Sequence, residues 1–189
     1  MFQNVISKIA NTDEKFSRYL YTHRLSDRAD KFLRFYTRLG DGYVWALIAI
    51  LIFAFYGPKY LAIVLFQVLP SVVASLALYW IVKLSTKRRR PFDAIREFKA
   101  LVPPLDKYSF PSGHTMNNLA VATTVLLSVP AAGIVMMFLP LSWGFLRVYF
   151  GVHWLSDVIG GFLLGIASFF IGHLIWCALL APVVSELFA

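Results

Sequence analysis

The chain has 189 residues, of which 59% are hydrophobic and only 15% are charged, against roughly 25% in ordinary soluble domains. Its mean hydropathy is +0.67 and its formal net charge is +8. This composition excludes a disordered tail, a collagen-like fibre and a disulfide scaffold, and a soluble fold of this length cannot bury so much apolar surface. The natural solvent is therefore lipid, and the basic charge indicates an acidic partner.

The first 41 residues differ from the rest because they hold 8 Lys/Arg and 5 Asp/Glu and offer no long apolar window. Apolar residues nevertheless recur at helical spacing, as in Phe2, Ile6, Ile9, Phe16 and Leu20. This pattern predicts amphipathic helices that lie along a membrane surface. Helices packed on the end of a helical bundle would show the same pattern, and the sequence leaves both interpretations open.

Four long stretches lack Asp, Glu, Lys and Arg, namely 42–58, 60–82, 115–146 and 158–185. A membrane-spanning helix needs about 20 apolar residues. The third stretch is too long for one helix, and Pro130 near its middle would break it. We therefore expect two spans there, 113–128 and 131–149, and five spans in all.

The fold class that follows is all-α, a multi-pass transmembrane helical bundle. Residues 1–189 are interpreted as one membrane-embedded domain. Residues 1–40 form its amphipathic interfacial region, and residues 41–182 form the transmembrane bundle.

A basic island follows the second predicted span and runs from Lys83 to Pro91, with Arg90 directly before the proline. Such a cluster beside a membrane span commonly binds anionic lipid headgroups or fixes topology. Lys87, Arg88 and Arg89 fit a patch of this kind. They either select anionic lipid or form a plain headgroup-binding patch. In a phosphoryl-transfer site, Lys83 and Arg90 of this island would instead hold the oxygens of a phosphate.

A second polar island, residues 109–115, contains Ser112, Gly113 and His114 after a proline. The backbone N–H groups at the start of a helix, with a glycine that permits close approach, form an anion site. His114 would then stand in the first turn of the helix and face the bound anion. A purely structural hydrogen bond from this histidine is the alternative.

The third island begins at Arg147 and contains His153 and Asp157. The two are four residues apart, so they share one helical face and can hydrogen-bond. A carboxylate on one imidazole nitrogen fixes the tautomer and leaves the other nitrogen free as a nucleophile or base. A polar pair that only joins helices is the alternative, although ionisable groups beside lipid are costly.

The topology brings the three islands to one membrane face. His114 lies 16 residues before Pro130, and Arg147 lies 17 residues after it, so two helical arms of about 25 Å run down and back. Three cations, two imidazoles and a carboxylate can converge there, a set that suits phosphoryl transfer. They are Lys83, Arg90, His114, Arg147, His153 and Asp157.

These motifs, in this order and at these spacings, resemble the type 2 phosphatidic acid phosphatase superfamily, a group of membrane lipid phosphatases with a vanadium haloperoxidase-like fold. The motif residues lie within 83–160, and the hydrophobic layout extends the resemblance to roughly 41–180. The segment Gly40-Asp41-Gly42 also looks like bacterial members of this family.

The resemblance implies a mechanism. His153 would attack phosphorus and form a phosphohistidine, Asp157 would orient it, and His114 would protonate the leaving oxygen. Water would then hydrolyse the intermediate, with no metal and no cofactor. The residues expected to bind the substrate phosphate are Lys83, Arg90, Ser112, Gly113 and Arg147.

The expected function is hydrolysis of a phosphomonoester or diphosphate of a membrane lipid, of the undecaprenyl diphosphate, phosphatidylglycerophosphate or phosphatidic acid type. Two alternatives stay open: a lipid phosphotransferase that uses the same phosphohistidine, and a non-enzymatic protein that binds anionic lipid. The expected partners are the lipid phosphate and the bilayer, with no nucleic acid.

The sequence departs from the family in two respects. Leu146 replaces the serine that commonly precedes Arg147, and five spans are found where bacterial relatives commonly have six. With two spans before Lys83, 17 of the 18 Lys/Arg lie on the face of the active site and only Lys59 lies opposite. A Lys/Arg excess marks the cytoplasmic side. We expect an integral protein of the bacterial inner (plasma) membrane with a cytoplasm-facing site, whereas family habit favours the periplasmic, outer face.

Overall fold

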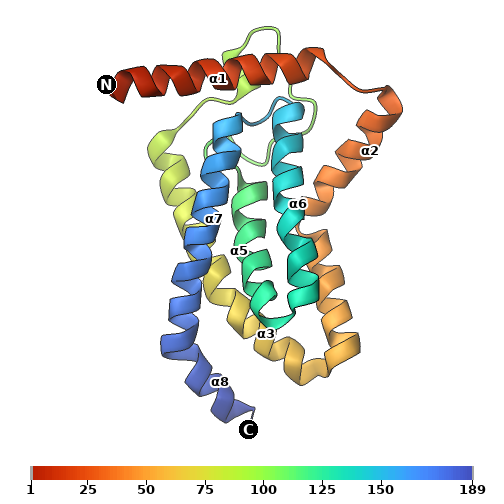
Figure 1. Cartoon of the computed structure of the whole chain (residues 1–189), viewed down its shortest axis with the longest axis vertical. Helices are drawn as coiled ribbons and strands as arrows, with labels where there is room; N and C mark the ends of the chain where they lie inside the picture. The colour runs from red at the N-terminus through yellow and green to blue at the C-terminus, as the bar shows by residue number, and fades with distance from the viewer. Residues whose placement is uncertain (1, 189) are drawn as a thin grey trace.

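The computed structural model describes residues 2–188, and within that range the chain is helical and forms no strand (Figure 1). The all-α expectation is therefore confirmed. The elements are α1 (Phe2–Thr22), α2 (Asp27–Arg38), a 3₁₀ turn (Leu39–Asp41), α3 (Tyr43–Thr86), α4 (Pro91–Ala94), α5 (Gly113–Ser128), α6 (Pro130–Tyr149), α7 (Leu155–Ile175), a π-helical turn (Trp176–Leu180) and α8 (Ala181–Leu187).

Helix α3 contains the first two predicted spans, and it reverses direction between them. Gly57 has φ 81° and ψ 175°, a backbone conformation outside the helical region, and Pro58 follows it. Glycine adopts positive φ without steric cost, and proline lacks the N–H that would continue a helix. Figure 1 shows the two arms of α3 meeting at the bottom of the molecule. The first two predicted spans are thus separated by a kink at Gly57 and Pro58.

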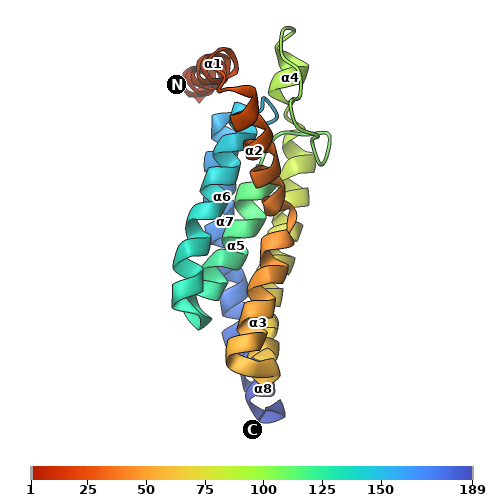
Figure 2. The same cartoon turned by 90° about the vertical axis from the view of Figure 1, so that its right-hand side faces the viewer.

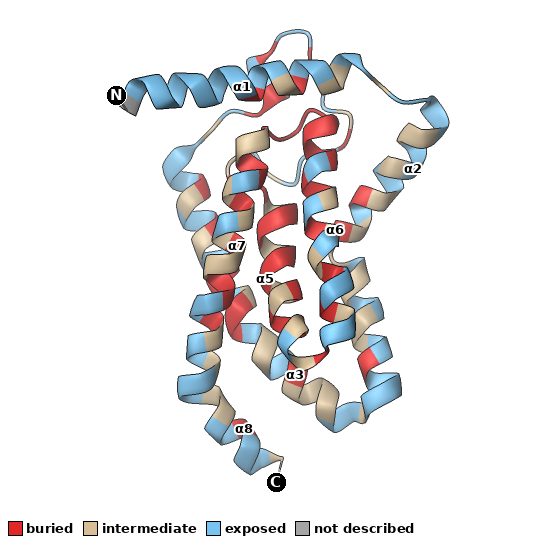
Figure 3. Ribbon diagram, viewed as in Figure 1, coloured by how far each residue is buried: buried red, intermediate tan, exposed pale blue. Residues whose placement is uncertain are grey.

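The break predicted at Pro130 is present, because α5 ends at Ser128 and α6 begins at Pro130. Helix α5 is the central helix of the bundle and packs against α3, α6 and α7. Figure 3 shows it as the most continuously buried element. A Cβ added to Gly165 of α7 would lie 2.7 Å from the carbonyl oxygen of Met116, so α7 and α5 pack too closely for a side chain there.

Among residues 2–188, three segments are long and apolar enough to cross a membrane, Tyr43–Ala94, Pro130–Tyr149 and Leu155–Leu187. Helix α5, with 16 residues, is shorter than each of them. Large apolar side chains cover the outside of the bundle, and Phe55, Phe138 and Leu174 are 79%, 68% and 68% exposed. Water is a poor solvent for such a surface, whereas lipid tails match it. The number of membrane crossings, five in our expectation, stays a prediction.

The N-terminal region forms two helices, α1 and α2. Figure 1 shows α1 lying across the ends of α6 and α7, and both helices contact it. Its inward face is mixed, since Asp13 and Ser17 are buried and Leu20 packs against the core, while Val5 and Ile6 are exposed. Helix α2 begins after Ser26, whose hydroxyl accepts a hydrogen bond from the backbone N–H of Ala29 and caps the helix. Packing on the end of the bundle is thus observed, and the membrane-surface role stays a prediction.

Candidate active site

The three polar islands meet at the end of the bundle that α1 covers. Lys83 lies in the last turn of α3, and Arg90 is the residue before α4. His114 lies in the first turn of α5, and Arg147 in the last turn of α6. His153 follows in the short α6–α7 connection. Figure 2 shows these helix ends and the long 95–112 loop on the same side of the molecule.

The His153 imidazole lies beside Asp157, as the four-residue spacing predicts, but the two residues do not share a helical face, because His153 precedes α7 (Leu155–Ile175) and Asp157 lies in its first turn. The Nδ1 atom of His153 lies 3.3 Å from Oδ2 of Asp157. That oxygen also accepts the backbone N–H of Trp154 at 2.7 Å, which closes a capping box at the start of α7. On the other side of the ring, Nε2 lies 3.3 Å from Nη1 of Arg90. The carboxylate thus favours the tautomer with the proton on Nδ1 and leaves Nε2 beside a cation.

Lys83 and Arg90 converge on a carboxylate that the motifs do not contain, Asp106. Nζ of Lys83 lies 2.8 Å from both carboxylate oxygens and 2.7 Å from the hydroxyl of Tyr79. Arg90 contributes Nη2 at 3.0 Å from Oδ1 of Asp106 and donates Nη1 to the carbonyl of Val152 at 2.7 Å. Asp106 therefore occupies the position between two buried cations where a phosphate was expected.

The ionisation of Asp106 follows from these contacts. Burial by itself would raise its pKa, but hydrogen bonds from Lys83 and Tyr79 and the charge of Arg90 outweigh burial and hold the pKa below its usual range. A charged carboxylate with two cationic partners is chemically close to the anionic oxygens of a phosphate ester. An incoming phosphate thus competes with Asp106 for Lys83 and Arg90.

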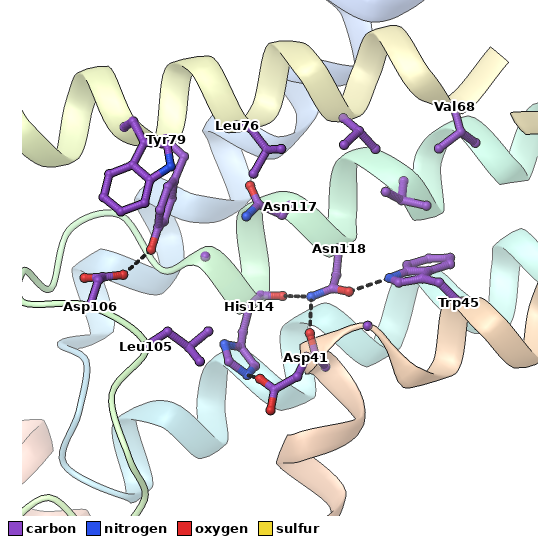
Figure 4. A pocket seen from close by; sticks show the side chains of 16 residues that line it. Asp41, Trp45, Val68, Leu76, Tyr79, Leu105, Asp106, His114, Asn117 and Asn118 are labelled. Carbon is purple, nitrogen blue, oxygen red and sulfur yellow. Dashed lines mark hydrogen bonds and ion pairs between the residues drawn. The ribbon is translucent and has the colours of Figure 1, made fainter. Parts of the chain in front are cut away.

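His114 faces a second carboxylate outside the three motifs. Its Nε2 atom lies 3.0 Å from Oδ1 of Asp41 (Figure 4). The close His114 ring lowers the pKa of Asp41, although Nε2 of His114 forms no well-aligned hydrogen bond with any described residue. Asn118, one turn further along α5, donates to the carbonyl oxygens of His114 and Gly40, each at 2.9 Å, and accepts the indole N–H of Trp45 at 2.6 Å. These bonds fasten the residues before α3 to the side of α5 that carries His114.

A cavity of about 520 Å³ opens beside this pair, between α3 and α5 (Figure 4). We call it the His114 cavity. Asp106 and Tyr79 line it at one end and Asp41 at another. Its walls are otherwise largely apolar, with Trp45, Val68, Val72, Leu76 and Val121 among them.

The remaining predicted phosphate ligands, Ser112, Gly113 and Arg147, have different contacts within the fold. The backbone N–H of Ser112 donates to the carbonyl of Asp157 at 3.0 Å, so this N–H is used within the fold. Gly113 lies against the ring of Tyr79, which leaves little room for a side chain. Arg147 is buried and donates Nη2 to the carbonyl of Pro103 at 3.2 Å, while its Nε atom has no partner among the described residues. The structure thus brings all eight predicted residues to one region, and their roles stay predictions.

The sequence interpretation missed Asp41 and Asp106 as members of the site, and it gave Arg88 to a headgroup patch. In the structure Arg88 donates to Oδ1 of Asp157 at 2.6 Å and to Oδ2 of Asp13 at 2.6 Å. Asp41 had a signal, because it stands between two glycines directly ahead of an apolar run. Asp106 and Asp13 had none, because only tertiary contacts distinguish them from other surface acids.

The protonation state of His153 gives the first prediction. Burial, followed by the charges of Arg90 and Arg147, lowers the pKa of His153 well below 6.5. The ring then stays neutral as the pH falls through 6.5, whereas the unfolded chain takes up a proton there, so stability falls with pH below that value. We expect ¹⁵N-histidine NMR of the detergent-solubilised protein, with His153→Ala for assignment, to show a neutral ring at pH 6.5. Half-titration at or above that pH would contradict the site geometry.

Comparisons with known proteins agree with this geometry. The sequence model of the PAP2 superfamily matches residues 64–179. The chain is similar to the undecaprenyl-diphosphatase of Sulfolobus acidocaldarius, with 34% identity over 135 residues that are 69% of this chain and 63% of the relative. It is also similar to phosphatidylglycerophosphatase B of Bacillus subtilis, with 37% identity over 79 residues, 34% of this chain and 37% of the relative. The chain spans less than two thirds of the length of either relative.

Two solved structures share the fold. One is the first transmembrane PAP2 type phosphatidylglycerolphosphate phosphatase from Bacillus subtilis, with a TM-score of 0.66, 25% identity, and coverage of 87% of this chain and 84% of that chain. The other is Aquifex aeolicus LpxE, with a TM-score of 0.67, 28% identity, and coverage of 85% and 94%. The helical bundle around the site is thus the PAP2 arrangement.

Proposed function

This chain belongs to the PAP2 superfamily, and from that membership together with the geometry of the site we propose that it is an integral membrane lipid phosphatase. The observation that carries the proposal is the environment of His153. One ring nitrogen is paired with the buried Asp157, and the other lies beside Arg90. This arrangement suits a neutral imidazole that attacks an anionic phosphorus.

The reaction has two steps. Nε2 of His153 attacks phosphorus, the bond from phosphorus to the leaving oxygen breaks, and His114 donates a proton to that oxygen. Water then attacks the phosphohistidine and gives up a proton to His114, the N–P bond breaks, and inorganic phosphate leaves. Lys83, Arg90 and Arg147, with Ser112 and Gly113, would hold the equatorial oxygens. Substrate can bind there only when Asp106 leaves its position between Lys83 and Arg90.

The chemistry is proposed to need no metal, since three buried cations can neutralise the charge that a metal ion would otherwise neutralise. Among residues 2–188 no group of three or more His, Cys, Asp or Glu is placed to hold a metal. We therefore expect a chelator to leave the activity of the purified protein unchanged, and loss of activity that a divalent cation restores would contradict this.

The lipid is proposed to be one of three types: undecaprenyl diphosphate, phosphatidylglycerophosphate or phosphatidic acid. The first two correspond to the names of the similar proteins. The apolar wall of the His114 cavity supports a lipid leaving group, because its chain would lie against Val68, Val72 and Leu76.

The test is phosphate release from these three lipids in neutral detergent micelles, with wild-type protein and His153→Ala in parallel. We expect the wild type to release phosphate from at least one lipid and the variant from none. Release that depends on an added hydroxyl acceptor would indicate a phosphotransferase. Equally slow release by both proteins from every lipid would contradict the enzyme and favour a lipid-binding role.

The topology is proposed to have five crossings, with α1 and α2 at the membrane surface and the active site facing the cytoplasm of a bacterial inner membrane. The distribution of Lys and Arg supports this orientation, since Lys59 alone lies at the opposite end of the bundle. Ser85→Cys, near the site, should resist an impermeant thiol reagent in intact cells in a Cys177→Ser background. Labelling at Ser85→Cys would place the site on the outer face.

A further inference from the structure

A second cavity, of about 320 Å³, lies between α2 and the 101–105 segment, and we call it the α2 cavity. Three cations of α2 line it, Lys31, Arg34 and Arg38, and Arg147 lines it from α6. Asp41 is its one acidic lining residue. At about 30 Å³ per water molecule, this volume holds roughly ten waters, more room than one phosphate group needs.

The positive charge of the α2 cavity is largely unneutralised. Asp41 is engaged with His114, and Arg34 donates to the carbonyl of Leu101 at 2.5 Å. Lys31 and Arg38 form no ion pair or hydrogen bond with another side chain in the described part of the chain. A surface with this charge attracts anions.

One buried group points to a ligand. Arg147 is 4% exposed, and its Nε atom lacks a hydrogen-bond partner anywhere in residues 2–188. An unpartnered buried donor is costly unless a ligand or water accepts from it. Because Arg147 both lines the α2 cavity and belongs to the predicted phosphate ligands, it links the two regions.

The α2 cavity also adjoins the His114 cavity, since Asp41 and Leu105 line both. We propose that the α2 cavity binds the second phosphate of a lipid that carries two phosphate groups, a proposal that rests on the proposed phosphatase function. His114 would protonate the leaving oxygen at the junction of the two cavities. The chain of the leaving group then lies in the apolar cavity, and its remaining phosphate lies among the α2 cations.

The proposal predicts that the enzyme prefers lipids whose leaving group carries a second phosphate to phosphatidic acid, whose leaving group carries none. Lipid diphosphates and phosphatidylglycerophosphate are lipids of the preferred kind. Lys31 and Arg38 are exposed, so each contributes modestly, and losing both is expected to weaken binding of one phosphate by about tenfold. General electrostatic attraction would instead be weakened just as much by loss of a cation of α2 that lies outside the cavity.

The experiment compares Lys31→Gln/Arg38→Gln with wild type on all three lipids in neutral micelles. KM for the two-phosphate lipids is expected to rise about tenfold more than KM for phosphatidic acid. Arg28→Gln is the matched control, because Arg28 is an exposed cation of α2 that does not line the cavity. Equal changes for all lipids, or none, would overturn the proposal.

A binding measurement keeps this test separate from the proposed function. Purified wild-type protein is expected to bind inorganic diphosphate more tightly than inorganic phosphate, and the double variant is expected to lose that preference. This readout needs no turnover. If the wild type prefers diphosphate but releases no phosphate from any lipid, the proposed phosphatase function is contradicted and the phosphate site in the α2 cavity is supported. If the wild type shows no preference for diphosphate, the phosphate site in the α2 cavity is overturned.

A second, independent observation concerns Asp13 of α1, a carboxylate that is only 2% exposed. It accepts the backbone N–H of Ser156 at 2.9 Å and the hydroxyl of the same residue. It also accepts Nη2 of Arg88 at 2.6 Å. Ser156 lies in the first turn of α7, so Asp13 binds the start of the helix that carries Asp157.

Arg88 extends this contact to the reacting histidine. Its Nη1 atom donates to Oδ1 of Asp157 at 2.6 Å, and Oδ2 of Asp157 faces His153. We infer that Asp13 is a positioning residue that acts on His153 through Arg88 and Asp157. A buried carboxylate is costly unless it is paired, and these contacts pair it with the active site. The N-terminal helix is thereby coupled to catalysis.

The test is Asp13→Asn, which keeps the shape of the side chain and removes its charge. We expect kcat to fall about tenfold with KM nearly unchanged, because positioning of the nucleophile is lost while substrate contacts remain. Asp13→Glu should recover part of kcat. Glu14→Gln is the control, since Glu14 is exposed and pairs only with Arg18. A lower melting temperature with unchanged kcat would overturn the inference and leave Asp13 a structural residue.

Discussion

Replacing His153 by alanine is expected to reduce phosphate release by at least about 10⁴-fold, the size of effect seen when a catalytic nucleophile is removed. The variant is expected to fold, because Asp157 keeps Arg88 and the backbone N–H of Trp154 as partners and is not left as an isolated buried charge. Single-turnover assays with detergent-purified protein measure the effect.

His23→Ala is the control for that experiment. His23 is an exposed histidine at the end of α1 that stacks on Tyr19, far in sequence from the three motifs. It should keep wild-type turnover. If His153→Ala retains more than about one hundredth of the wild-type rate with a normal melting temperature, His153 is not the nucleophile.

Replacing Lys83 by methionine is expected to lower the free energy of unfolding by about 3 kcal/mol, because it removes one partner of a buried ion pair. Lys83 is fully buried, and Asp106 is 12% exposed and would keep only Arg90 as a cation. Activity should also be lost, since Lys83 is proposed to hold phosphate. Denaturant unfolding in detergent, followed by tryptophan fluorescence, measures the stability.

The double variant Lys83→Met/Asp106→Asn separates the two effects. The double variant also removes the carboxylate that Lys83 no longer neutralises, and Arg90 keeps its hydrogen bonds to the backbone carbonyls of Asp106 and Val152, so part of the stability should return while activity stays low. If the double variant is as unstable as Lys83→Met, loss of the ion pair with Asp106 does not explain the lower free energy of unfolding. The methionine itself would then disrupt the packing. Asp106→Asn alone is expected to bind inorganic phosphate more tightly, because the competing carboxylate is gone.

Sequence patterns were sufficient where one helix or one turn decides the geometry. Pro130 starts α6 where the apolar run needed a break. The predicted contact between His153 and Asp157 is present, but it is made across the start of α7 and not along one helical face, because His153 precedes the helix. The resemblance between the three motifs and the PAP2 superfamily also proved correct, because the sequence model of that superfamily matches residues 64–179.

The patterns failed where partners are far apart in the chain. Asp13 meets Ser156 across 143 positions, and Trp45 meets Asn118 across 73. Neither contact has a period or a spacing that a single sequence displays. Asp106 lies in a loop whose course is set by tertiary bonds, such as that from the N–H of Ser109 to the carbonyl of Arg88. Such loops carry no hydrophobic periodicity, so their acids cannot be placed beforehand.

The central claim is that phosphate passes through His153. Its most direct measurement is to mix the protein with a lipid whose terminal phosphate carries ³²P, quench at alkaline pH, and locate the label by peptide mapping. The account predicts a base-stable label on His153 that disappears on acid treatment and that is absent from His153→Ala. Turnover with a label on another residue, or with the same label in His153→Ala, would contradict it.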